Sequence, residues 1–97
     1  MRLVVHPAAR REIESAFAWY CIEAGHTMAT RFVDELDHLQ RMLLEHPQIG
    51  EKRRGGTRRV IFSRFPYTLV YRIHGDLLQI IALAHQNRAP EYWVGRA

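Results

Sequence analysis

Basic side chains that could bind phosphate or carboxylate groups are concentrated in the second half of this 97-residue sequence. Residues 50–97 carry nine basic and three acidic side chains, whereas residues 1–49 carry five basic and seven acidic ones. All but one of the basic residues are arginine, whose planar guanidinium suits both phosphate and carboxylate. This distribution predicts an acidic partner, either nucleic acid or an acidic protein segment. The alternative is a solvated basic surface with no partner.

The densest basic stretch is Lys52-Arg-Arg-Gly-Gly-Thr-Arg-Arg59, with five basic residues in eight positions. Glycines between the charges allow the backbone to approach a phosphate chain closely. Residues 52–54 could equally be a mobile, solvated loop, whereas basic residues held on strands favour binding. The candidate target-binding or nucleic-acid-binding residues are therefore Arg58, Arg59, Arg64, Arg72 and Arg88.

His85 follows an apolar run, at the point where the chain is expected to leave a sheet. Histidine exchanges protons near neutral pH, so His85 is a candidate general acid or base. The alternative is that His85 and Asn87 cap the end of the strand, and that Arg88 pairs with a carboxylate.

No cofactor or metal site is predicted. The six histidines and the single Cys21 show no ligand spacing, and no phosphate-binding glycine loop or nucleophile motif is present. One cysteine allows no intrachain disulfide, which fits a reducing, cytoplasmic location. Residues 1–5 are too short an apolar start for a signal peptide, and no run approaches the ~18 apolar residues of a membrane span.

Two apolar stripes at helical spacing predict two helices in the first half. The first covers residues 8–24 after Pro7, and the second runs from an N-cap at Thr27 to the residue before Pro47. Gly25 is placed to end the first helix in a left-handed turn. Because the connection is so short, the helices should form an antiparallel hairpin. Their acidic residues, including Glu12 and Glu14, are expected on solvated faces.

The remaining patterns predict strands at residues 2–6, 58–63, 68–74 and 77–84, with a loop over residues 47–56. The run 77–84 is almost wholly apolar, which is typical of a strand that is covered on both faces and central in the sheet. Pro90 could open a last short helix, anchored on the core by Tyr92 and Trp93.

The predicted fold is therefore a single α+β domain over residues 1–97. It has an N-terminal strand, an antiparallel helical hairpin packed on a mainly antiparallel four-stranded sheet, and a short C-terminal helix.

Short motifs spread over nearly the whole chain carry a family resemblance. They are His6-Pro-Ala-Ala-Arg10, Arg31-Phe-Val-Asp-Glu-Leu36, His46-Pro-Gln-Ile-Gly50, Arg58-Arg59, Arg64-Phe-Pro-Tyr-Thr-Leu-Val-Tyr-Arg72, and His85-Gln-Asn-Arg-Ala-Pro90 followed by Trp93. In their order and spacing they resemble the ParE/RelE toxin superfamily, and the last two resemble its ParE branch more closely.

This resemblance implies the toxin of a bacterial type II toxin–antitoxin system, of the kind associated with plasmid stabilization. Such a toxin is neutralised by a cognate antitoxin that is acidic toward its C-terminus, and operator DNA is bound only through the antitoxin. The residues expected to contact the antitoxin in this chain are Phe32, Leu36, Arg59 and Tyr71.

The superfamily has two main activities. ParE-like members inhibit DNA gyrase and block replication, whereas RelE-like members cut messenger RNA on the ribosome without a metal. RelE-like nucleases tend to have a basic residue about where Thr68 stands, and this departure favours the gyrase hypothesis. If the chain is a nuclease, the catalytic candidates are Arg64, His85 and Arg88. A third hypothesis is a non-toxic remnant that only binds antitoxin.

Overall fold

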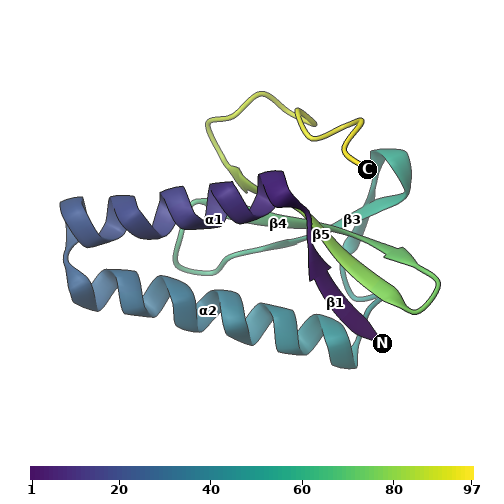
Figure 1. The fold of residues 1–97 in the computed structure, drawn as a ribbon, viewed down its shortest axis with the longest axis horizontal. Coiled ribbons are helices and arrows are strands. Elements are labelled where there is room, and N and C mark those ends of the chain that lie inside the picture. The colour runs from purple at the N-terminus through teal and green to yellow at the C-terminus, as the bar shows by residue number, and fades with distance from the viewer.

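The computed structural model describes residues 1–97, and Figure 1 shows a helical hairpin beside a single sheet. The elements in chain order are β1 (Arg2–Val5), α1 (Pro7–Trp19), the π-helical turn η1 (Tyr20–Ala24), α2 (His26–Glu45), β2 (Glu51–Arg53), the 3₁₀ turn η2 (Arg54–Gly56), β3 (Thr57–Ile61), β4 (Tyr67–His74) and β5 (Leu77–His85). The predicted α+β class and helical hairpin are confirmed. No helix is both long enough and apolar enough to cross a membrane.

A single residue, Gly25, connects the two arms of the helical hairpin. Gly25 has a φ of 91°, which glycine adopts without strain, and α2 begins at His26 directly after it. Gly25 itself takes the N-cap position of α2, so the prediction that Thr27 would cap this helix is wrong. At the other end of the hairpin, the His6 ring accepts a hydrogen bond from the Ala8 amide at 3.0 Å and caps α1.

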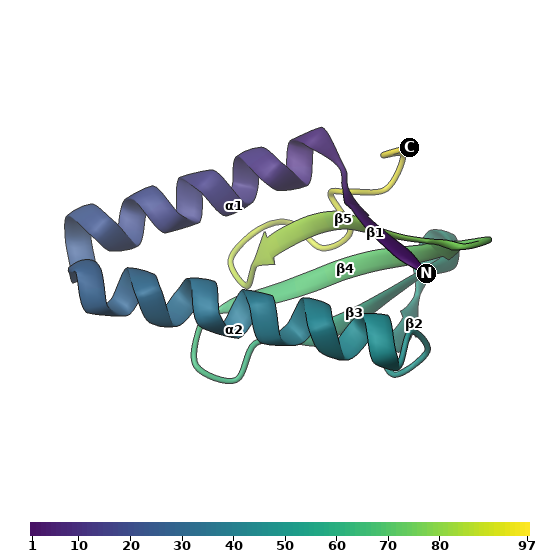
Figure 2. The same ribbon diagram turned by 60° about the horizontal axis from the view of Figure 1, so that its bottom comes forward.

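The sheet has five strands in the order β1-β5-β4-β3-β2, with β1 parallel to β5 and all other neighbours antiparallel. The strand predicted to be central, β5, is an interior strand that lies second in the order, between β1 and β4 (Figure 2), and β4 takes the central position. The predicted count of four strands was one too few, because residues 51–53, expected in a loop, pair with β3. The three residues of this edge strand are all exposed and charged. The strand therefore has no alternation of apolar and polar side chains from which it could be predicted.

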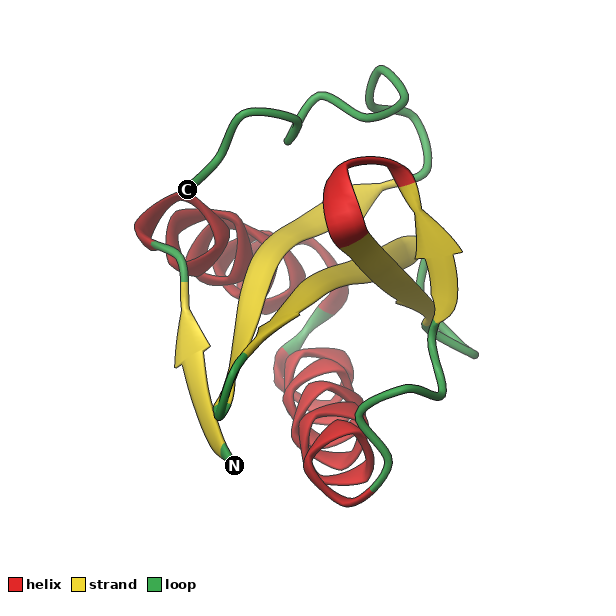
Figure 3. Ribbon diagram, turned by 90° about the vertical axis from the view of Figure 1, so that its right-hand side faces the viewer, coloured by secondary structure: helices red, strands yellow, loops and turns green.

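Both faces of the sheet are buried along β5, and a bulge in its pairing with β4 shifts the register between Val70 and Tyr71. Leu78, Ile80 and Leu83 of β5 belong to the core that packs against the helices. Ile81, Ala82 and Ala84 belong to a second apolar cluster, together with Val70 and Trp93. Figure 3 shows the C-terminal segment passing over the sheet on the opposite side from α2.

The C-terminal segment is not the short helix that Pro90 was expected to open. Residues 90–95 form turns. Glu91 has a φ of 60° and Gly95 a φ of 99°, and both angles are incompatible with a right-handed helix. Trp93 is nevertheless 7% exposed and packs on the sheet, so its predicted role as an anchor is confirmed.

Candidate functional site

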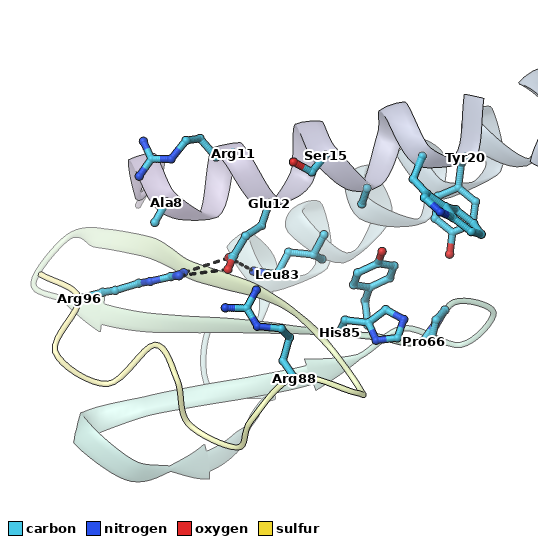
Figure 4. A pocket seen from close by; sticks show the side chains of 13 residues that line it. Ala8, Arg11, Glu12, Ser15, Tyr20, Pro66, Leu83, His85, Arg88 and Arg96 are labelled. Carbon is cyan, nitrogen blue, oxygen red and sulfur yellow. Dashed lines mark hydrogen bonds and ion pairs between the residues drawn. The ribbon is translucent and has the colours of Figure 1, made fainter. Parts of the chain in front are cut away.

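A groove of about 700 Å³ lies between α1 and the end of β5 (Figure 4). It exists because β1 ends at Val5, opposite Ile80, whereas β5 continues to His85. Beyond Val5, helix α1 flanks β5 in place of a strand. The lining comes from α1, η1, the start of β4, the end of β5 and the C-terminal segment.

Side chains take the hydrogen-bonding positions that a neighbouring strand would occupy along this part of β5. The Glu12 carboxylate accepts from the Leu83 amide at 3.1 Å. The Arg96 guanidinium donates to the Ile81 carbonyl at 3.0 Å, and the Tyr92 hydroxyl lies 3.3 Å from the Leu83 carbonyl. Backbone groups that would otherwise be buried without partners are thereby satisfied. The same bonds hold both α1 and the C-terminal segment to the sheet.

Glu12 and Arg96 form a two-pronged ion pair at 3.0 and 3.1 Å, and the Tyr92 hydroxyl donates to Glu12 at 2.7 Å. The Arg96 and Glu12 side chains are only 18% and 15% exposed. Burial by itself would raise the pKa of Glu12, but the hydrogen bonds from Arg96 and Tyr92, with the Arg96 charge and the Leu83 amide, lower it overall. Burial and the neighbouring Glu12 carboxylate raise the pKa of Tyr92. The network therefore keeps an ionised carboxylate beside a neutral hydroxyl.

The prediction of a solvated face for Glu12 is wrong. Its partner Arg96 is 84 positions away in the sequence, and no local pattern could place the two together.

The groove combines an apolar wall with a basic rim. Trp19, which is 56% exposed, lies on the wall with Ala8 and Ala16. Three arginines line the groove, and the only acidic residue in the lining is Glu12, which Arg96 already neutralises. A surface of this kind suits an amphipathic segment that carries acidic side chains.

Comparison with known proteins identifies the family. The model of the ParE toxin of the type II toxin–antitoxin system parDE matches residues 3–90. This chain belongs to the ParE toxin family. The resemblance seen in the sequence motifs is thus confirmed.

A solved structure has the same fold as this ParE family member. A chain described as the chromosomal ParDE toxin–antitoxin system from P. aeruginosa superposes with a TM-score of 0.76, covering 88% of this chain and 95% of that chain. The two sequences are 19% identical, so the likeness is one of fold. No curated protein matches the sequence.

The five arginines predicted to bind a target do different things in this ParE family member. Arg59 and Arg88 line a second cavity, which lies between the sheet and residues 85–93. Arg58 donates to the Gln48 and Gly50 carbonyls at 3.0 and 2.9 Å. Arg72 donates to the Arg96 and Gly55 carbonyls at 3.3 and 3.4 Å. Arg58 and Arg72 therefore tie loops to the sheet.

The three nuclease candidates do not gather in one place. His85 and Arg88 line both the groove and the second cavity, whereas Arg64 lines neither. Arg64 lies in a separate hollow beside α2, where its backbone amide donates to Glu35 at 3.3 Å. The His85 ring accepts from the Asn87 amide at 3.0 Å, which is the strand-capping arrangement considered as the alternative to catalysis.

Three of the four residues expected to contact the antitoxin lie in the core of the ParE fold. Phe32 and Tyr71 are fully buried and Leu36 is 6% exposed, because the apolar stripe of α2 and the helix-facing side of β4 pack together. Tyr71 donates to the Pro47 carbonyl at 2.7 Å and accepts from the Gly50 amide at 2.9 Å. These three side chains are therefore part of the core and are not open to direct contact with a partner. Arg59, with a side chain 30% exposed, is the one that a partner could reach directly.

No group of three or more His, Cys, Asp or Glu side chains is arranged to hold a metal ion.

Proposed function

We propose that this ParE-family toxin inhibits DNA gyrase and so blocks replication in the bacterial cytoplasm. We further propose that a cognate acidic antitoxin neutralises it by docking in the groove between α1 and β5, and that operator DNA is bound only through the antitoxin. The observation that carries the antitoxin proposal is the groove itself, where the interior strand β5 loses its strand neighbour between an apolar wall and a basic rim.

The charge of the groove supports an acidic occupant. Arg11 and Arg88 line it without any carboxylate within salt-bridge distance, since all four ion pairs of the chain involve other residues. An acidic segment would meet complementary charge there, and complementary charge speeds association and selects the partner. The apolar wall at Trp19 provides the area from which affinity is gained.

Filling the groove should prevent neutralisation. The exposed Ser15 lines the groove, so Ser15→Trp is expected to weaken binding of the protein encoded by the neighbouring gene by roughly tenfold or more, about 1.4 kcal/mol. Ala18→Trp is the matched control, because Ala18 is exposed on the same helix outside the groove lining. Binding would be measured by calorimetry, with folding checked by circular dichroism. Equal affinity for both variants would contradict the proposed docking site.

Gyrase is favoured over the ribosome by the placement of the candidate catalytic residues. The three candidate catalytic residues do not surround one phosphodiester, because Arg64 is separated from the two cavities that His85 and Arg88 line. The His85 nitrogen Nδ1 is also engaged by the Asn87 amide.

Controlled expression in a bacterium tests this choice. Separate labels for DNA and protein synthesis are expected to show DNA synthesis falling first, and His85→Ala should still arrest growth. If protein synthesis falls first and His85→Ala abolishes the effect, the chain is a ribosome-dependent nuclease. If neither label falls while the neighbouring gene product still binds, the chain is a remnant that only forms the complex.

A further inference from the structure

A second cavity, of about 330 Å³, lies between the strands β3 and β4 and the C-terminal segment. Its lining includes Arg53 and Arg59 from the β2 and β3 region, Arg88 from the C-terminal segment, and the polar side chains of Thr68, His85 and Gln86. The volume is at the lower end of the range of roughly 300–1,000 Å³ found for small-molecule sites.

Two buried hydrogen-bond donors without partners belong to residues that line this cavity. They are Nε of Arg59 and the indole Nε1 of Trp93, and no other buried side-chain nitrogen or oxygen of the chain lacks a partner. Buried donors are nearly always paired, because leaving one unsatisfied is costly. Because both exceptions belong to residues that line the same cavity, they are consistent with a ligand there that accepts hydrogen bonds.

The charges around the cavity indicate that this ligand is an anion. Three arginines line it against a single carboxylate, that of Glu91. A second carboxylate, Glu51, lies beside it: one of its oxygens is 3.0 Å from Arg53 and 3.1 Å from Arg59. Glu51 is 58% exposed, so it can move away when a better acceptor arrives.

We propose that this cavity binds a phosphate group, with Arg53, Arg59 and Arg88 as its cationic ligands and the Trp93 indole as a neutral donor. A tetrahedral phosphate oxyanion can accept several hydrogen bonds at once, and arginine is the side chain best shaped to provide them. Glu51 competes for the same guanidinium groups. The cavity shares His85 and Arg88 with the groove proposed for the antitoxin, whereas Arg53, Arg59 and Trp93 line the cavity alone, so phosphate binding can be measured without the antitoxin.

Nuclear magnetic resonance can follow the two unpaired donors directly, because the arginine Nε–H and the indole N–H give their own signals. Titration with inorganic phosphate, at constant ionic strength kept with sodium chloride, is expected to shift the Arg59 and Trp93 side-chain signals saturably. Trp19→Phe removes the other indole and leaves the Trp93 signal unambiguous. A parallel titration with adenosine monophosphate separates free phosphate from nucleotide, since a tighter response to the nucleotide identifies it as the source.

Three substitutions make the proposal falsifiable. Arg59→Gln and, independently, Arg88→Gln should each weaken binding about tenfold or more, whereas Arg41→Gln, at an exposed position on α2 away from the cavity, should not. Glu51→Gln removes the competitor and should strengthen binding several-fold. The proposal is overturned if neither phosphate nor the nucleotide shifts the two signals, or if Glu51→Gln weakens binding.

Discussion

Replacing Ile80 with aspartate is expected to leave no stably folded chain. Ile80 is fully buried on β5 and faces the core beneath the helices. An ionised carboxylate placed there has no partner, and its effective burial penalty is several kcal/mol. That penalty is comparable to the whole stability of a domain of this size, roughly 5–15 kcal/mol. The variant should show no cooperative urea transition by circular dichroism.

Ile22→Asp is the matched control for this substitution. Ile22 is 78% exposed at the tip of the helical hairpin, so its replacement should change the free energy of unfolding by no more than about 0.5 kcal/mol. A soluble Ile80→Asp protein that unfolds cooperatively near the wild-type midpoint would show that β5 is not an interior strand.

Glu12→Ala should have the second largest effect, lowering the free energy of unfolding by about 3 kcal/mol. Removing one partner of a buried pair typically costs roughly 3–5 kcal/mol, and the lower end applies because both side chains keep some contact with solvent. The substitution leaves the Leu83 amide without its acceptor, and it leaves Tyr92 and Arg96 only the backbone carbonyls of Leu83 and Ile81. Urea unfolding at neutral pH measures the loss.

Glu14→Ala provides the comparison for Glu12→Ala, because Glu14 is exposed on the same helix and takes part in no ion pair or hydrogen bond of its side chain. It should be close to neutral. Similar losses for the two variants would mean that the network around Glu12 contributes little to stability.

The pH dependence of stability should carry the signature of the same network. Because the pKa of Glu12 is lower in the folded chain than its ordinary value, the unfolded state binds more protons as the solution becomes acidic. The contribution of Glu12 is therefore fully present above its unfolded pKa of about 4.3, and it is lost as pH falls through the folded value. The difference in stability between wild type and Glu12→Ala should shrink below about pH 4. A constant difference would contradict the lowered pKa.

Local patterns predicted the elements that bury apolar stripes. The hairpin around Gly25, the interior strand β5 and the anchoring of Trp93 all follow from periodicity, from a glycine that can adopt a positive φ, and from the burial of large aromatic rings. The same reasoning missed β2, because a charged edge strand has no apolar side to detect. Local patterns also predicted a helix after Pro90. That prediction was wrong because Glu91 has a positive φ, which nothing in the local sequence indicates.

The candidate sites depended on contacts between distant parts of the chain. The arginine-rich composition predicted anion binding in general. It could not show that Arg58 and Arg72 hold loops to the sheet, whereas Arg59 and Arg88 line a cavity. The pairing of Glu12 with Arg96 depends on where the C-terminal segment crosses the sheet, and that path is set by the burial of Trp93.

A supercoiling assay with purified DNA gyrase tests the central claim most directly. Relaxed plasmid, gyrase and ATP would be incubated with the purified toxin, alone or with the protein encoded by the neighbouring gene. We expect the toxin to stop supercoiling at a stoichiometric excess, and the partner protein to restore it. Full supercoiling in the presence of folded toxin, together with arrest of a cell-free translation reaction by the same preparation, would contradict gyrase as the target.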